Sequence, residues 1–131
     1  MPNAPKQFRM GPSKHEQAKP TGRRKGSPSS RGYGSRWQRF RAWYFAYPCN
    51  VLCGCGCNRP AEELDHLEHV SGKDDERFFD VENVLGLTVA CHARKTASVD
   101  GSFGRGATAE GVKMLAAFKA EAKRRAAEMA R

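Results

Sequence analysis

An aspartate, an asparagine and two histidines form the group of residues in this chain best suited to chemistry. Asp65 and His66 are adjacent. Asn83 follows after a polar stretch, and His92 comes directly after Cys91. A carboxylate binds hard divalent cations, and a histidine beside it can accept a proton near neutral pH. A second histidine from another element can complete the metal site, and one metal, one base and nearby arginines are sufficient to hydrolyse a phosphodiester.

These residues resemble the HNH nuclease motif, in the variant whose first position reads Asp-His. The interval from Asn83 to His92, with a cysteine just before the histidine, is similar to that of the family. The resemblance implies that Asp65 and His92 bind the catalytic metal and that His66 deprotonates the attacking water. It implies that Asn83 ties the loop between two strands and is no metal ligand. The implied cofactor is Mg²⁺ or Mn²⁺, with Ni²⁺ or Zn²⁺ as alternatives.

Four of the five cysteines lie within Cys49–Cys57, and the fifth is Cys91. Cysteines this close cannot form a useful set of loop-closing disulfides, so metal ligation in a reducing compartment is favoured. Many HNH proteins bind a structural zinc through two Cys-x-x-Cys pairs, but here Thr88 and Gly54 stand where two of those cysteines would be. The resemblance therefore implies a rearranged zinc site, with Cys55 as the spare thiol. Its predicted ligands are Cys49, Cys53, Cys57 and Cys91. The alternative is a vestigial cluster that binds zinc weakly or not at all.

Two short strands and a helix must position the candidate residues. Strands are predicted over residues 61–67, which end at the Asp-His pair, and over residues 84–88. A helix is predicted over residues 89–97. Two strands and a helix wrapped on a metal form the ββα-metal core that the resemblance implies, an α+β fold expected for residues 35–105.

Two longer helices are predicted to flank this core. Ser35 is expected to cap the first, which ends before Pro48 and packs through its aromatic residues, Trp37, Phe40, Tyr44 and Tyr47. Thr108 is expected to cap the second, which forms most of residues 106–131. Its apolar side is predicted to consist of Val112, Leu115, Phe118, Ala122 and Met129.

The basic residues are concentrated at the start of the chain. The 131 residues have a formal charge of +9, and residues 1–41 hold eleven Lys/Arg against one acid. Residues 1–34 also hold five of the seven prolines and no apolar periodicity, which predicts a disordered basic arm. Such an arm suits nucleic acid, the commonest polyanion, or is a solvated tail that aids solubility. No apolar run has membrane-spanning length, and the N-terminal residues lack the apolar core of a secretory signal. No membrane partner is therefore expected, and a cytoplasmic location is predicted.

The flanks of the motif extend the resemblance to residues 31–105. Residues 31–39 (RGYGSRWQR) and 95–105 (KTASVDGSFGR) look like those of phage and prophage HNH proteins, which often act with the terminase. The expected phosphate contacts are Arg36, Arg39, Arg94 and Lys95. The resemblance thus implies an endonuclease that nicks or cuts double-stranded DNA in a bacterial host cytoplasm, with the terminase large subunit as a partner in genome packaging. Two alternatives stay open: a homing-type nuclease of a mobile element, and a zinc-stapled nucleic-acid-binding module without turnover.

Overall fold

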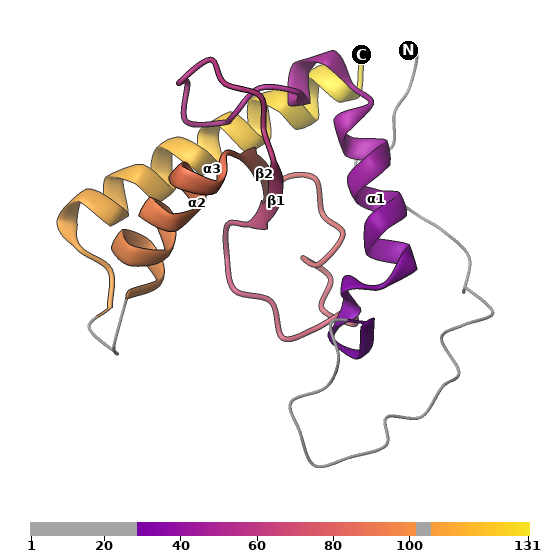
Figure 1. Cartoon of the computed structure of the whole chain (residues 1–131), viewed down its shortest axis with the longest axis horizontal. Helices are drawn as coiled ribbons and strands as arrows, with labels where there is room; N and C mark the ends of the chain where they lie inside the picture. The colour runs from indigo at the N-terminus through magenta and orange to yellow at the C-terminus, as the bar shows by residue number, and fades with distance from the viewer. Residues whose placement is uncertain (1–28, 102–105) are drawn as a thin grey trace.

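A two-stranded antiparallel sheet lies between α-helices in the computed structural model, which describes residues 29–101 and 106–131 (Figure 1). Within these residues the α+β structure has three α-helices. The strands are β1 (Glu63–His66) and β2 (Val84–Leu87), and the helices are α1 (Ser35–Phe45), α2 (Val89–Lys95) and α3 (Ala109–Met129). Helix α1 covers one side of the hairpin, while α2 and α3 cover the other (Figure 1). The predicted basic arm lies largely outside the described residues.

The two faces of the hairpin belong to two different core clusters. On β2, Val84 packs with the aromatic residues of α1, whereas Leu85 and Leu87 pack with residues of α2 and α3. The register pairs Asp65 with Leu85 and His66 with Val84. Because successive side chains of a strand point to opposite faces, Asp65 faces α2 and His66 faces α1. Asp65 and His66, which are neighbours in the sequence, therefore lie on opposite faces of the sheet.

Helix α1 buries the aromatic side that its spacing predicts, with Trp37, Phe40, Tyr44 and Tyr47 all in the core. Gly34, and not the predicted Ser35, occupies its N-cap position and provides no side-chain cap. The preceding residues, predicted to belong to the disordered arm, instead form a helical turn, η1 (Ser29–Tyr33), which is broken at Gly32 by a φ of 101°. This turn brings Tyr33 against the core.

Helix α3 begins after Thr108, whose side chain accepts a hydrogen bond from the Gly111 N–H at 3.0 Å, as the predicted cap requires. Phe118, Ala122 and Met129 are buried as predicted, but Val112 is 60% exposed. In the first turn the buried position is Gly111, where a Cβ atom would collide with the backbone of Ser98. The turn is thus packed by a backbone contact that apolar periodicity cannot detect. None of the described helices has the length and apolar character needed to cross a bilayer.

Candidate functional site

The acid and the histidine predicted to bind a metal meet between β1 and α2. Asp65 Oδ1 lies 3.4 Å from His92 Nε2. Two ligand atoms of one octahedral Mg²⁺ at about 2.1 Å each are roughly 3 Å apart when they are neighbours. The side chains present therefore fit a shared hard divalent cation with little movement.

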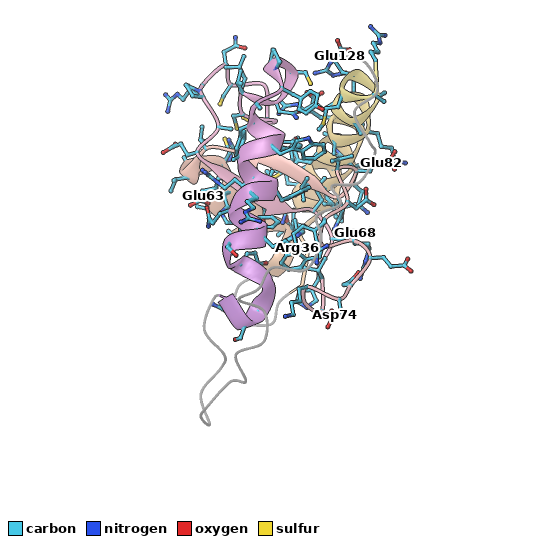
Figure 2. The ribbon with its side chains drawn as sticks, turned by 90° about the vertical axis from the view of Figure 1, so that its right-hand side faces the viewer. Arg36, Glu63, Glu68, Asp74, Glu82 and Glu128 are labelled. Carbon is cyan, nitrogen blue, oxygen red and sulfur yellow. The ribbon has the colours of Figure 1, made fainter. Side chains whose placement is uncertain are left out.

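Glu63, which the sequence reasoning did not identify, orients His92. Its carboxylate hydrogen-bonds to His92 Nδ1. Glu63 and Asp65 are two residues apart on β1, so both point to the same face, toward α2. A proton on Nδ1 leaves the lone pair of Nε2 facing Asp65, which is the tautomer that a metal ligand needs. The Glu-x-Asp spacing within the predicted strand was the sequence signal that could have identified Glu63, because it places both acids on one face. Figure 2 shows Glu63 to one side of α1 and Glu68 to the other.

Lys95 lies inside the molecule and contacts Asp65. The sequence predicted a surface phosphate contact, but Lys95 is only 1% exposed and its Nζ lies 2.9 Å from Asp65 Oδ2. Because Lys95 follows His92 by three residues on α2, both reach the same carboxylate. A charge this deeply buried requires a partner. The structure therefore corrects the prediction: Lys95 is the internal counter-ion of Asp65, which leaves Oδ1 directed at His92.

His66 is enclosed by aromatic rings on the other face of β1. Its ring centroid lies 4.9 Å from that of Trp37 and 4.7 Å from that of Phe78. Nε2 donates to the backbone carbonyl of Phe78 at 2.8 Å, so the neutral ring keeps its lone pair on Nδ1. Burial lowers the pKa of His66. The imidazole is therefore neutral at pH 7 and has one unprotonated nitrogen, Nδ1.

Asn83 ties the loop that follows β1, as predicted. Its Oδ1 accepts from the Glu68 N–H at 2.9 Å, and its Nδ2 donates to the carbonyls of Glu68 and Arg77 at 3.3 and 3.2 Å. The amide is buried, and all three bonds are to backbone groups. Its role is to hold the loop that presents the Phe78 carbonyl to His66.

Two of the basic residues predicted to contact phosphates are exposed. Arg39 lies on α1 and Arg94 on α2. Arg36 is partly buried, with its guanidinium 4.3 Å from the centroid of the Phe79 ring (Figure 2). The exposed pair lies on helices that cover opposite sides of the hairpin.

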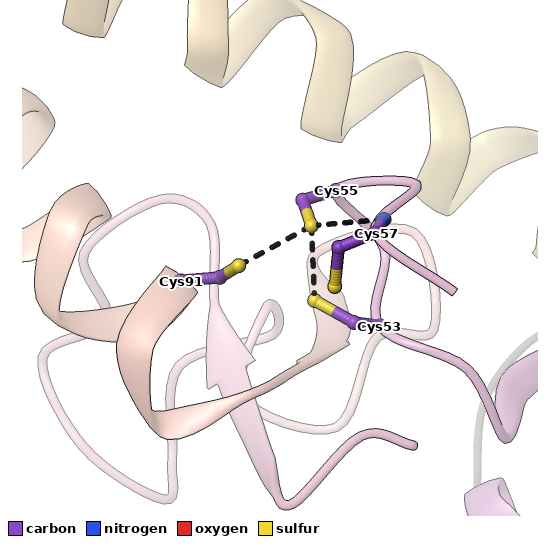
Figure 3. A group of neighbouring side chains, drawn as sticks. All are labelled: Cys53, Cys55, Cys57 and Cys91. Carbon is purple, nitrogen blue, oxygen red and sulfur yellow. Dashed lines mark hydrogen bonds between the residues drawn. The ribbon is translucent and has the colours of Figure 1, made fainter. Parts of the chain in front are cut away.

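Four cysteines form a cluster (Figure 3), and one of them directly precedes His92 on α2. They are Cys53, Cys55, Cys57 and Cys91, and their sulfur atoms all lie within 4.8 Å of one another. Sulfur ligands of a tetrahedral zinc at about 2.3 Å are about 3.8 Å apart. The cluster can therefore hold a metal such as zinc. Within the part of the chain that the structure describes, it is the one group of three or more potential ligands with this proximity.

The cluster differs from the predicted ligand set by one exchange, because Cys55 belongs to it and Cys49 does not. Cys49 lies in the short turn η2 (Pro48–Asn50), which the fully buried Asn50 anchors in the core. Its thiol faces the carbonyl of Arg125 at 4.0 Å. Burial also raises the pKa of Cys49, which disfavours the thiolate that a metal requires. The orientation of η2 therefore removes Cys49 from the set.

Thr88 and Gly54, which stand where the resemblance would place two further cysteines, help to build the cluster. Thr88 caps α2 by accepting from the Cys91 N–H at 3.1 Å, while its own N–H donates to Cys53 Sγ at 3.3 Å. The Gly54 N–H donates to a carbonyl of β2 at 2.8 Å. Any Cβ atom at Gly54 would collide with Leu85. Glycine thus lets the cysteine loop lie directly on the sheet.

Hydrogen bonds among the clustered thiols shift the pKa values of two of them in opposite directions. Burial opposes ionisation of Cys53, but hydrogen bonds from Cys55, Thr88 and Cys91 outweigh it and lower the pKa of Cys53 to about 7. Burial and hydrogen bonds with the three neighbouring cysteines raise the pKa of Cys55. One thiolate therefore forms easily, whereas four would repel one another without a cation. The donor set fits a thiophilic divalent metal.

Comparison of the chain with protein-family models, with characterised proteins and with solved structures gave no match.

Proposed function

We propose that this protein is a metal-dependent HNH-type endonuclease that hydrolyses phosphodiester bonds of DNA. The observation that carries the proposal is the 3.4 Å approach of Asp65 Oδ1 to His92 Nε2, with Glu63 bonded to the opposite ring nitrogen. A carboxylate and an imidazole directed at each other form a two-ligand site for a divalent cation. The antiparallel pair β1 and β2, followed by α2, is similar to the ββα-metal arrangement that the resemblance implies.

Asp65 and His92 would hold the catalytic cation. Oxygen and nitrogen donors suit Mg²⁺ or Mn²⁺ better than they suit thiophilic metals. When bound, such an ion would polarise the scissile phosphate and stabilise the leaving oxygen. Lys95 contributes by pairing with the second oxygen of Asp65. Its Nζ lies 2.9 Å from Asp65 Oδ2, which leaves Oδ1 to face His92.

His66 would be the general base. Its Nδ1 holds the lone pair, and the bond from Nε2 to the Phe78 carbonyl fixes the orientation of the ring. The lowered pKa keeps the ring neutral, the state a base needs in order to take a proton from the attacking water. Asp65 and His66 face opposite sides of β1, so the scissile phosphate would lie across the end of the strand. The exposed Arg39 and Arg94 would contact flanking phosphates.

The cysteine cluster would serve the same function as a scaffold. We propose that it holds a structural zinc through Cys53, Cys55, Cys57 and Cys91. Cys91 belongs to α2, the helix that also provides His92. A metal bound by the loop and the helix would therefore set the position of the catalytic ligand.

The test is nicking of a supercoiled plasmid with and without magnesium or manganese. His66→Ala should lower turnover by about 10²–10⁴-fold, because a general base acts mainly in the transition state. Its DNA affinity should be retained, and thermal melting checks that it folds, because His66 packs against Trp37 and Phe78. His69→Ala is the matched control, since His69 is exposed, and it should nick normally. Near-normal turnover by His66→Ala at saturating metal would refute the assignment. DNA binding by the wild type without metal-dependent nicking would favour the zinc-stapled binding module.

A further inference from the structure

Tyr33 covers the one free lone pair of His66. Its hydroxyl lies 3.4 Å from His66 Nδ1, while Nε2 already donates to the Phe78 carbonyl. Burial, and next the charge of Asp65, raise the pKa of Tyr33. The hydroxyl therefore remains protonated at neutral pH, and the geometry makes it the donor to Nδ1.

Packing, and not the hydroxyl alone, holds Tyr33 in this place. Its ring lies edge-on to the Trp37 ring, with the two centroids 5.3 Å apart. The centroid of the Tyr33 ring also lies 5.2 Å from that of the Phe78 ring. The preceding Gly32 has a φ of 101°, and a Cβ atom there would lie 2.7 Å from Phe78 and 2.9 Å from Lys73. Glycine at position 32 thus permits the close approach that brings turn η1 over the base.

We propose that Tyr33 is a gate on the general base, and that duplex DNA opens it. This inference rests on the proposed nuclease function. The single lone pair of Nδ1 cannot accept a proton from water while it accepts the Tyr33 hydroxyl, and a 3.4 Å separation has no room for a water between them. The hydroxyl must therefore move before His66 can act. Arg31, in the same turn, is exposed and gives an approaching phosphate backbone a contact on the segment that must move.

The test compares wild type with Tyr33→Phe, which keeps the ring and removes the hydroxyl. Long-range ¹H–¹⁵N spectra of ¹⁵N-histidine-labelled protein report whether each imidazole nitrogen accepts a hydrogen bond. Without DNA, the His66 Nδ1 resonance of Tyr33→Phe should shift toward that of an unbonded nitrogen. A short DNA duplex, with no magnesium or manganese added, should abolish the difference between the two proteins. Tyr47→Phe, whose ring packs on Trp43, is the control and should match wild type throughout.

Kinetics provide the second readout. Loss of one weak hydrogen bond that must otherwise be broken should raise kcat/KM for the duplex by about twofold to tenfold in Tyr33→Phe. A lower kcat in a folded Tyr33→Phe would show that the hydroxyl assists the reaction, and would overturn the gate. Identical Nδ1 resonances without DNA, or a difference that persists at saturating DNA, would overturn it as well. Absence of nicking by every variant would remove the nuclease proposal, while the spectra would still decide whether DNA displaces Tyr33.

Discussion

The cysteine cluster and the Asp65–His92 pair are built on neighbouring residues by opposite strategies. Three of the four clustered thiols come from one stretch, residues 53–57, and all the donors are sulfur. The other pair combines oxygen and nitrogen donors from a strand and a helix. The cysteine cluster can assemble from the loop of residues 53–57 with one further residue, Cys91. The Asp65–His92 pair exists only when β1 and α2 are already in place.

Helix α2 joins the two sites and makes their relationship unequal. It has seven residues and contributes Cys91 to the cluster and His92 to the acid–histidine pair. A helix this short has little stability of its own, so its position depends on what holds it. Damage to the cluster should therefore destroy the candidate active site, whereas damage at the active site should leave the cluster intact.

The largest expected effect is loss of the fold when the proposed zinc is removed from the cluster. Structural zinc contributes roughly 10–16 kcal/mol in small cysteine sites at neutral pH, as much as the whole stability of a typical domain. Cys91→Ser and Cys55→Ser should therefore lower zinc content and the thermal midpoint strongly. Cys49→Ser is the control and should melt like wild type, because Cys49 is outside the cluster. Zinc absent from purified wild type, or unchanged melting of Cys91→Ser, would contradict the scaffold role.

The next largest effect is expected at the buried ion pair between Lys95 of α2 and Asp65 of β1. Lys95→Met leaves the Asp65 carboxylate in the interior without its cation, a change that costs roughly 3–5 kcal/mol. Urea unfolding should show this loss, while zinc content stays at the wild-type level. Arg94→Met, at the exposed neighbouring position, should stay within about 0.5 kcal/mol of wild type. Combining Lys95→Met with Asp65→Asn should recover part of the loss; an additive double variant would mean the two groups do not interact.

The elements of this fold could largely be predicted from the sequence, because each has a local cause. Aromatic spacing predicted α1, and the Thr108 cap predicted the start of α3. Thr88, predicted to end the second strand, instead caps α2. Val112 shows where periodicity fails. Its neighbour Gly111 takes the buried position because a backbone from another element approaches there, and this contact leaves no apolar pattern.

The site was predictable in its main pair and not in its surroundings. Motif spacing identified Asp65 and His92, and the structure brings them together. The direction of a long side chain depends on tertiary contacts, so Lys95 was assigned to the surface although it points inward. The exchange of Cys49 for Cys55 has the same origin, since the orientation of a three-residue turn decides which thiol faces the cluster.

Glu63 provides a smaller effect, confined to the acid–histidine pair. Glu63→Ala removes the acceptor that holds the His92 tautomer and should weaken Mn²⁺ binding by about 10–100-fold. Glu63→Gln keeps an acceptor and should lie between this variant and wild type. Calorimetric titration of Mn²⁺ into zinc-loaded protein measures the affinity. Glu62→Gln is the matched control at an exposed neighbouring position and should bind Mn²⁺ normally. Equal affinities for Glu63→Ala and wild type would show that Glu63 does not orient a ligand.

The smallest expected effect is at Thr88, where the two sites adjoin. Its hydroxyl caps α2, and loss of such a cap typically costs about 1 kcal/mol. Cys53 Sγ lies 3.3 Å from the Thr88 backbone N–H and 3.9 Å from the hydroxyl, and any residue except proline retains the shorter of these two contacts. Thr88→Ala should therefore unfold at slightly lower denaturant with unchanged zinc content, and Thr88→Ser should match wild type because the cap is restored. Zinc loss in Thr88→Ala would mean that the α2 cap, and not the thiols alone, assembles the cluster. The loop would then depend on the helix as much as the helix depends on the loop.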